Sequence, residues 1–345
     1  MAAEQEVNIQ SGRVPSLRAI IKASRPKQMV KNGLVLVPLF FTVNIWYNSG
    51  DIGGMTAIAG RAFAALGIFV LISAAVYFIN DSVDVEKDRA HPKKRFRPIA
   101  AGRISVPWAI GISIVFIVGG MAAAFVASTP LAIAVGAYLA INIAYSLWLK
   151  NVVLIDVMVV ASGFVVRAVA GSIAINHAVI KPLGGNPQEL DLTISPWLYV
   201  VTALGALFLA LAKRRNELQN AGESSGAQRS MLSEYSIPLL DNLINIVATA
   251  TLVAYTLYTF NTGVSEANVP DNNSMMLTIT FVAYGIFRYL YLIHIKGVGE
   301  SPEEILIRDK PLLLNIFLWL VTGSSVLMWS RLTNNTCAEY FGICF

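Results

Sequence analysis

The sequence of 345 residues has few of the residue types that build several common catalytic sites. It holds only two cysteines and three histidines, and they are scattered, so no His/Cys metal-binding set is present. It also lacks a Gly-Lys-Ser/Thr sequence, so a P-loop for nucleotides is excluded. We find no clear internal repeat of the kind that marks many secondary transporters. Any chemistry must therefore come from other residue types.

Charge is scarce as well. Only 14% of the residues are Asp, Glu, Lys or Arg, against about 25% in an ordinary soluble domain, and 55% are hydrophobic. Several apolar runs approach or exceed the roughly 20 residues that a helix needs to cross a bilayer. We assign nine of them, at about 33–49, 60–80, 107–128, 130–149, 152–175, 196–212, 239–261, 274–294 and 311–330. The sequence therefore predicts an all-α polytopic membrane protein, divided into an N-terminal segment (1–32), a nine-helix transmembrane domain (33–331) and a C-terminal tail (332–345).

The positions of the basic residues predict the orientation of these helices. Of the 26 Lys and Arg residues, all but five lie before the first run or in alternate connections after it. The exceptions are Arg61, Arg167, Lys181, Arg288 and Arg331. Because cytoplasmic loops are enriched in Lys and Arg, we expect a plasma-membrane protein with a cytoplasmic N-terminus and an external C-terminus. Residues 1–32 are polar, so no signal peptide is expected there.

The most informative charged segment follows the second apolar run. It contains Asn80, Asp81, Asp84, Glu86 and Asp88, and a run rich in Lys and Arg comes directly after it. Residues four apart share a helix face, so Asn80, Asp84 and Asp88 should form one stripe with Asp81 beside them. Carboxylate and amide oxygens suit Mg²⁺, which usually keeps several waters and substrate phosphate oxygens. The simpler alternative is a solvated loop whose acids merely offset its bases.

Basic residues in five predicted cytoplasmic segments would converge if the helices form one bundle. Arg makes forked contacts to phosphate oxygens, and Lys supplies a point charge. The candidates for anion contacts are Lys27, Lys31, Arg95, Arg97, Lys213, Arg214 and Arg308. Each could instead be an ordinary anchor at the cytoplasmic face. Together with the acidic stripe, the pattern favours a Mg²⁺–diphosphate site at the inner membrane surface.

Two ionisable residues fall within the predicted helix 152–175. Such residues are costly in a membrane and usually face a bundle interior or a cavity. Asp156 lies near the cytoplasmic end and could be tied to Lys150, or it could serve the site. Arg167 is deeper, where a structural role, bonding the helix backbone or Asn176, and a functional role are both open.

The pattern Asn80-Asp81-x-x-Asp84-x-x-x-Asp88 resembles the first aspartate motif of the UbiA-type intramembrane prenyltransferases. The resemblance extends over about residues 16–331. It implies a nine-helix bundle in which Asn80, Asp84 and Asp88, with Asp81 as a further candidate, bind Mg²⁺ that bridges a diphosphate, and in which Asp84 and Asp88 are the catalytic pair.

The second motif of that family is incomplete here. Most members carry a second Asp-x-x-x-Asp motif, preceded by Tyr-x-x-x-Lys. In this chain Tyr145 and Lys150 are five residues apart, and Asp156 is followed four residues later by Val160. A transferase using a prenyl diphosphate with a quinone precursor or another acceptor is therefore the alternative rather than the first choice.

The basic segments resemble more closely the polyprenyl-phosphate (decaprenyl-phosphate) phosphoribosyltransferase branch of the family. They are Arg25–Asn32, His91–Gly102, Lys213–Leu218 and Arg308–Lys310. This resemblance implies transfer of a 5-phosphoribosyl group from phosphoribosyl diphosphate (PRPP) to a polyprenyl phosphate in the bilayer, for cell-wall arabinan synthesis. It adds Tyr145, Lys150 and Asp156 to the expected substrate-binding residues.

Some features remain open at this stage. A membrane transporter is the competing class, but it should place polar residues through the bilayer midplane of several helices. Homo-oligomers are possible, because small residues in the helices permit close packing. Cys337 and Cys344 could form a disulfide in the external tail or remain free thiols, and the predicted external loop 178–191 has no assigned role.

Overall fold

The computed structural model describes residues 14–92, 94–176, 178–180, 188–189, 196–220, 230–260, 273–297, 305–306 and 308–341. In the last range, side chains are described as far as Trp329. The loop 178–191 and the side chains of Cys337 and Cys344 therefore lie largely or wholly outside the described residues. Within the described ranges the chain is almost entirely helical, in agreement with the predicted fold class.

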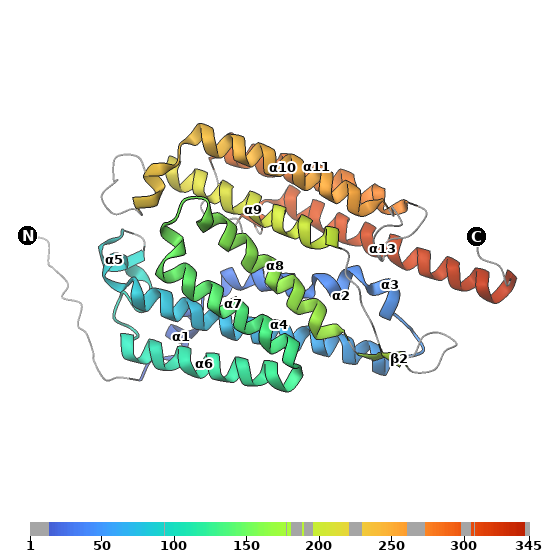
Figure 1. Cartoon of the computed structure of the whole chain (residues 1–345), viewed down its shortest axis with the longest axis horizontal. Helices are drawn as coiled ribbons and strands as arrows, with labels where there is room; N and C mark the ends of the chain where they lie inside the picture. The colour runs from blue at the N-terminus through green and yellow to red at the C-terminus, as the bar shows by residue number, and fades with distance from the viewer. Residues whose placement is uncertain are drawn as a thin grey trace, which may run out of the picture.

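The elements follow one another along the chain as Figure 1 shows. The N-terminal third comprises α1 (Leu17–Ala23), η1 (Pro26–Leu36), α2 (Val37–Phe41), α3 (Val43–Trp46), α4 (Ile52–Val83), α5 (Val85–Ala90) and η2 (Lys94–Phe96). The middle comprises α6 (Val106–Ala127), α7 (Thr129–Leu147), η3 (Leu149–Asn151), α8 (Ile155–Ile175), β1 (Val179–Ile180), β2 (Gln188–Glu189) and α9 (Pro196–Gln219). The remainder comprises η5 (Ser230–Glu234), α10 (Ile237–Thr259), η6 (Ser274–Thr278), α11 (Ile279–His294) and α13 (Lys310–Phe341). The two short strands pair antiparallel, with Val179 opposite Glu189.

Eight helical segments in the described part of the chain are long and apolar enough to cross a membrane. They correspond to eight of the nine predicted runs. The prediction of one continuous helix at 33–49 is wrong, because this stretch is divided among η1, α2 and α3. Pro38 lies at the start of α2, where proline is well tolerated. Helix α2 ends at Phe41, and the hydroxyl of the capping residue Thr42 donates to the carbonyl of Pro38 at 2.7 Å. The periodicity of an apolar run does not reveal such breaks.

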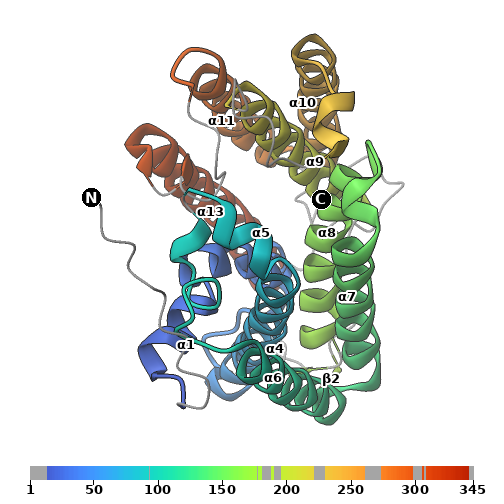
Figure 2. The same cartoon turned by 90° about the vertical axis from the view of Figure 1, so that its left-hand side faces the viewer.

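The long helices form a curved row in which each packs against the next in chain order. Contacts join α6 to α7, α7 to α8, α8 to α9, α9 to α10, α10 to α11 and α11 to α13. Figure 2 shows this row nearly end-on. Helix α4 packs on α6, α7 and α8, and η1 lies against both α4 and α8. Helices α2 and α3 contact both α13 and α4, so they connect the last helix of the row with α4.

Helix α4 carries the charged segment to one end of this bundle. Its 32 residues span about 48 Å at 1.5 Å per residue, which exceeds the roughly 30 Å of hydrocarbon in a bilayer. At its start, the Asp51 carboxylate caps the helix by accepting a hydrogen bond from the Gly54 amide at 2.9 Å. A helix longer than the membrane can project its last polar turns beyond the apolar core, where charged side chains are tolerated.

Candidate active site

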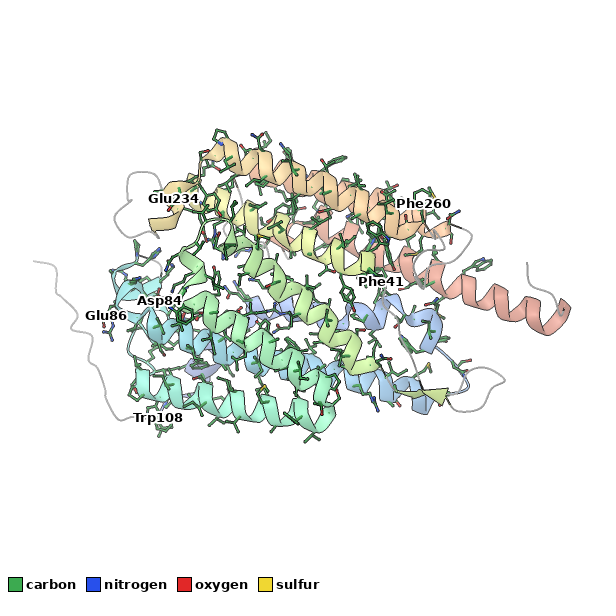
Figure 3. All side chains as sticks on the ribbon, viewed as in Figure 1. Phe41, Asp84, Glu86, Trp108, Glu234 and Phe260 are labelled. Carbon is green, nitrogen blue, oxygen red and sulfur yellow. The ribbon has the colours of Figure 1, made fainter. Side chains whose placement is uncertain are left out.

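The acidic segment spans a break between two helices. Helix α4 ends at Val83, Asp84 caps it, and α5 begins at Val85. The Asp84 amide still donates to the Asn80 carbonyl at 2.9 Å, and the Asp88 amide donates to the Asp84 carbonyl at 2.8 Å. The turn therefore continues nearly helically through the break. Figure 3 labels Asp84 and Glu86 at the same end of the molecule as Glu234, far from Phe41 and Phe260.

Two of the carboxylates are buried and paired with arginines. The Arg97 Nη1 atom lies 2.6 Å from Asp88 Oδ2 and 3.1 Å from Asp81 Oδ1, so one guanidinium joins both acids. Arg25 pairs with the same oxygen of Asp81 and stacks over the Tyr77 ring, 4.9 Å from its centroid. Buried charges require such partners. Asp81 and Asp88 are thus already neutralised by protein groups.

Asn80 and Asp84 lie on a different face, one helical turn apart. The carboxamide oxygen of Asn80 accepts a hydrogen bond from the Ser146 hydroxyl on α7. Asp84 lies 3.3 Å from the Lys150 ammonium in η3, and its side chain remains 30% exposed. The three residues of the expected stripe thus follow one another at helical spacing but have different partners, since Asp88 pairs with Arg97 while Asn80 and Asp84 contact Ser146 and Lys150.

The donor set of this face fits a magnesium ion. Mg²⁺ takes oxygen ligands and is usually held by one or two carboxylates, with water and phosphate oxygens completing its coordination. Asn80 and Asp84 supply an amide oxygen and a half-exposed carboxylate. Among the described residues, no group of three or more His, Cys, Asp or Glu side chains is arranged to enclose a metal. Asn80 and Asp84 could therefore hold such an ion only together with water or a bound ligand that supplies the remaining oxygens.

A second ion-pair cluster lies where α7, α8 and α9 meet. Arg214 Nε is 2.5 Å from Asp156 Oδ2, and Arg214 also pairs with Glu217 and donates to the Tyr145 hydroxyl at 3.2 Å. The Asp156 side chain is 0% exposed. Its other oxygen accepts a hydrogen bond from Tyr235 at 2.9 Å. The alternative pairing of Asp156 with Lys150 is thus wrong, since Lys150 pairs with Asp84.

Tyr235 was not predicted as part of this site. It lies between η5 and α10, and its hydroxyl accepts a hydrogen bond from the Leu154 amide at 2.8 Å while donating to Asp156. Burial raises the pKa of Tyr235 to about 12, and the adjacent Asp156 carboxylate acts in the same direction. The hydroxyl therefore keeps its proton at neutral pH and orients the carboxylate. No motif in the sequence connects the two residues, which are 79 positions apart.

The remaining predicted anion contacts differ in how they are placed. Lys27 is exposed and Lys31 half-buried on η1, while Lys213 is 3.8 Å from Glu217 on its own helix. Arg95 is exposed and stacks on the Phe96 ring, 4.9 Å from its centroid. Arg308 is exposed just before α13. Arg97 and Lys150 pair with carboxylates of the acidic segment, and Arg214 pairs with Asp156.

The fold and the site define a polytopic helical membrane protein with two clusters of acidic and basic residues at the helix ends. Residues 35–300 match the model of the UbiA prenyltransferase family, and the chain belongs to that family. It is 32% identical over 318 residues to decaprenyl-phosphate phosphoribosyltransferase of Mycolicibacterium smegmatis, covering 90% of this chain and 93% of that protein. The protein of that name in Corynebacterium glutamicum is 32% identical over 304 residues, covering 87% and 84%.

A solved structure supports the fold assignment. The structure of a UbiA homolog from Archaeoglobus fulgidus bound to GPP and Mg²⁺ aligns with a TM-score of 0.63. It covers 90% of this chain and 99% of that one at 18% sequence identity. The chain is therefore a membrane transferase with the UbiA fold, as the aspartate motif predicted.

Proposed function

We propose that this protein transfers a 5-phosphoribosyl group from PRPP to a polyprenyl phosphate and releases diphosphate, with Mg²⁺ as cofactor. The names of relatives that are about 30% identical over most of their length support this choice. The lipid product would feed cell-wall arabinan synthesis. The same proposal places the active site and the N-terminus on the cytoplasmic side, where PRPP would be available.

The observation that carries the proposal is the contrast between two carboxylates. Asp84 is 30% exposed beside Lys150, whereas Asp156 is wholly buried and paired with Arg214. A prenyl diphosphate-dependent enzyme with two aspartate motifs needs accessible carboxylates in both. Here one accessible carboxylate stands among basic residues, which suits one metal-bound diphosphate and further phosphate groups. That arrangement favours PRPP, which carries a diphosphate at C1 and a monophosphate at C5.

The reaction follows from the charges available. The bond between C1 of the ribose and the diphosphate breaks, and its electron pair leaves with the diphosphate. An oxygen of the lipid phosphate, already ionised, supplies the pair for the new bond to C1, so no strong general base is needed. Mg²⁺ held by Asn80 and Asp84 would neutralise the leaving diphosphate. Lys150 and the basic residues of η1 would hold the two anionic reactants together against their mutual repulsion.

The test is transfer of label from [¹⁴C]PRPP into lipid by the purified protein with a polyprenyl phosphate and Mg²⁺. Label should enter the lipid fraction with the wild type, and it should be lost with EDTA and in Asp84→Ala. The variant Glu86→Gln is the matched control, because Glu86 is 79% exposed and pairs only locally with Arg89. Absence of labelled lipid in an otherwise folded wild type would refute the proposal.

A further inference from the structure

The segment η1 has an unusual form of helix. It is a 3₁₀ helix of 11 residues, although such helices rarely exceed three or four residues, and long ones often mark functional or strained segments. Its burial has the same period of three. Asn32 is 1% exposed, Val35 is 0% exposed, and Pro38, which follows in α2, is buried as well. The face of η1 that packs on the bundle is thus defined by 3₁₀ winding.

This winding aligns two polar residues on another face. Residues three apart stack above one another in a 3₁₀ helix, so Gln28 and Lys31 form one line. Arg25 is the N-cap of η1, with a left-handed backbone (φ of 53°), and its side chain pairs with Asp81 and bonds Gln28 at 3.4 Å. The N-cap residue thus connects this line to the carboxylates. In an α-helix, with 3.6 residues per turn, Lys31 would be rotated by about 60° from Gln28. The 3₁₀ form therefore keeps Lys31 in line with the residue that Arg25 contacts.

A buried polar cluster holds η1 in this form. The Asn32 carboxamide oxygen accepts hydrogen bonds from Arg167 Nε on α8 at 2.8 Å and from the Ser73 hydroxyl on α4 at 3.1 Å. Arg167 is itself fixed by the Gly163 carbonyl at 2.8 Å and the Tyr138 hydroxyl at 2.6 Å. Asn176, which the sequence offered as an alternative partner of Arg167, takes no part in these hydrogen bonds.

The cost of this cluster argues for a specific role. Arg167 is only 6% exposed, and its partners in the described part of the chain are all neutral groups. A cation placed this deep in a membrane bundle is expensive. Close backbone packing adds to the fixation, because a Cβ atom at Gly171 would collide with the Val35 carbonyl oxygen. Through Asn32, the Arg167 side chain holds η1 against α8.

We propose that Arg167 is a positioning residue that acts through Asn32. The pair locks η1 between α4 and α8 in its 3₁₀ form, and this places Arg25 and Lys31 at the site that receives the phosphorylated donor. The proposal rests on the proposed function only for the identity of that donor. Loss of the lock should weaken donor binding and leave binding of the lipid acceptor unchanged.

The test compares Asn32→Ala with Asn315→Ala. Asn315 is also buried and joins two helices, by donating to the Phe281 carbonyl at 2.9 Å, but it lies between α13 and α11. In Asn32→Ala, KM for PRPP should rise about tenfold or more, with kcat and KM for the polyprenyl phosphate nearly unchanged. Asn315→Ala should leave KM for PRPP unchanged. Arg167→Lys, which keeps the charge, should be impaired less than Arg167→Gln.

Hydrogen exchange of the amides of residues 26–36 provides a readout that needs no substrate. Exchange should accelerate in Asn32→Ala and Arg167→Gln but not in Asn315→Ala. Unchanged exchange would overturn the proposal, as would faster exchange with a fall in kcat and no change in KM for PRPP. If the wild type transfers no label at all, the proposed function fails, and the exchange data alone decide whether Arg167 positions η1. Should Asn32→Ala fail to fold, Arg167→Lys and Arg167→Gln carry the same comparison.

Discussion

Arg214 and Asp156 form a buried ion pair across the interface of α9 and α8, with 2.5 Å between Nε and Oδ2. The two side chains are 5% and 0% exposed. By its position in the sequence, Asp156 is what remains of the second aspartate motif of the family. Its carboxylate is paired with Arg214. Asp156 is therefore held by Arg214 and Tyr235, and Arg214 in turn contacts Tyr145.

Removal of one member of this pair should destabilise the protein strongly. Arg214→Met leaves a buried, uncompensated carboxylate, for which a loss of about 3–5 kcal/mol is typical. The double variant Asp156→Leu/Arg214→Met should recover most of that stability, because no buried charge remains unpaired. Thermal unfolding in detergent measures the stability of the single and the double variant, and Lys213→Met on the same helix is the control. Equal melting temperatures for Arg214→Met and the wild type would contradict this account.

Substitution of Asp84 should weaken the response to magnesium. Asp84→Asn keeps the size of the side chain but removes the accessible negative charge, so activity should fall by about 100-fold or more, as for loss of other key electrostatic groups. The concentration of Mg²⁺ that gives half-maximal activity should rise in the same variant. A magnesium titration of activity checks both effects. An unchanged titration curve in Asp84→Asn would place the metal elsewhere.

The junction before α13 should make stability depend on acid pH. The hydrogen bonds from Arg288, at 2.8 and 3.1 Å, lower the pKa of Asp309, and the Leu312 amide acts in the same direction. A lowered pKa stabilises the folded protein above the ordinary pKa of about 3.9, and this stabilisation is lost as the pH falls through the folded-state value.

The variant Asp309→Asn isolates this effect. Its melting temperature should lie below that of the wild type at neutral pH, and the difference should shrink as the pH falls below about 4. When Arg288 is replaced by Gln, Asp309→Asn should no longer change the melting temperature in this pH-dependent way, because the guanidinium that lowers the pKa of Asp309 is absent. A difference that is equal at neutral pH and at the lowest pH at which both proteins fold would show that Asp309 does not act through its charge.

Much of the fold was predictable because it rests on long apolar runs. Eight of the nine runs became long helices, and the aspartate pattern indicated the family that the comparisons then showed. The first run was misread because Pro38 and the 3₁₀ winding of η1 break the helix without interrupting hydrophobicity. Such a break depends on contacts made by Asn32 to α4 and α8, which sequence periodicity does not contain.

The candidate site was predictable in composition but not in pairing. The spacing predicted that Asn80 and Asp84 lie one helical turn apart, and the backbone hydrogen bond between them confirms this. The partners of the other acids come from distant segments, as with Tyr235 and Arg214 around Asp156. Arg25 begins the basic segment Arg25–Asn32, but its contact with Asp81 involves a left-handed backbone at Arg25, with φ of 53°, that the sequence does not reveal. Long-range pairs of this kind are set by tertiary packing alone.

A competition between two donors in one reaction tests directly which group the protein transfers. Purified protein, Mg²⁺ and a polyprenyl phosphate are incubated with equal concentrations of PRPP and geranylgeranyl diphosphate, and the lipid products are identified by mass spectrometry. We expect a polyprenyl phosphate that has gained one 5-phosphoribosyl group, absent in Asp84→Ala, while geranylgeranyl diphosphate is not consumed. Consumption of geranylgeranyl diphosphate with no phosphoribosylated lipid would contradict it and favour a prenyl diphosphate-dependent transferase.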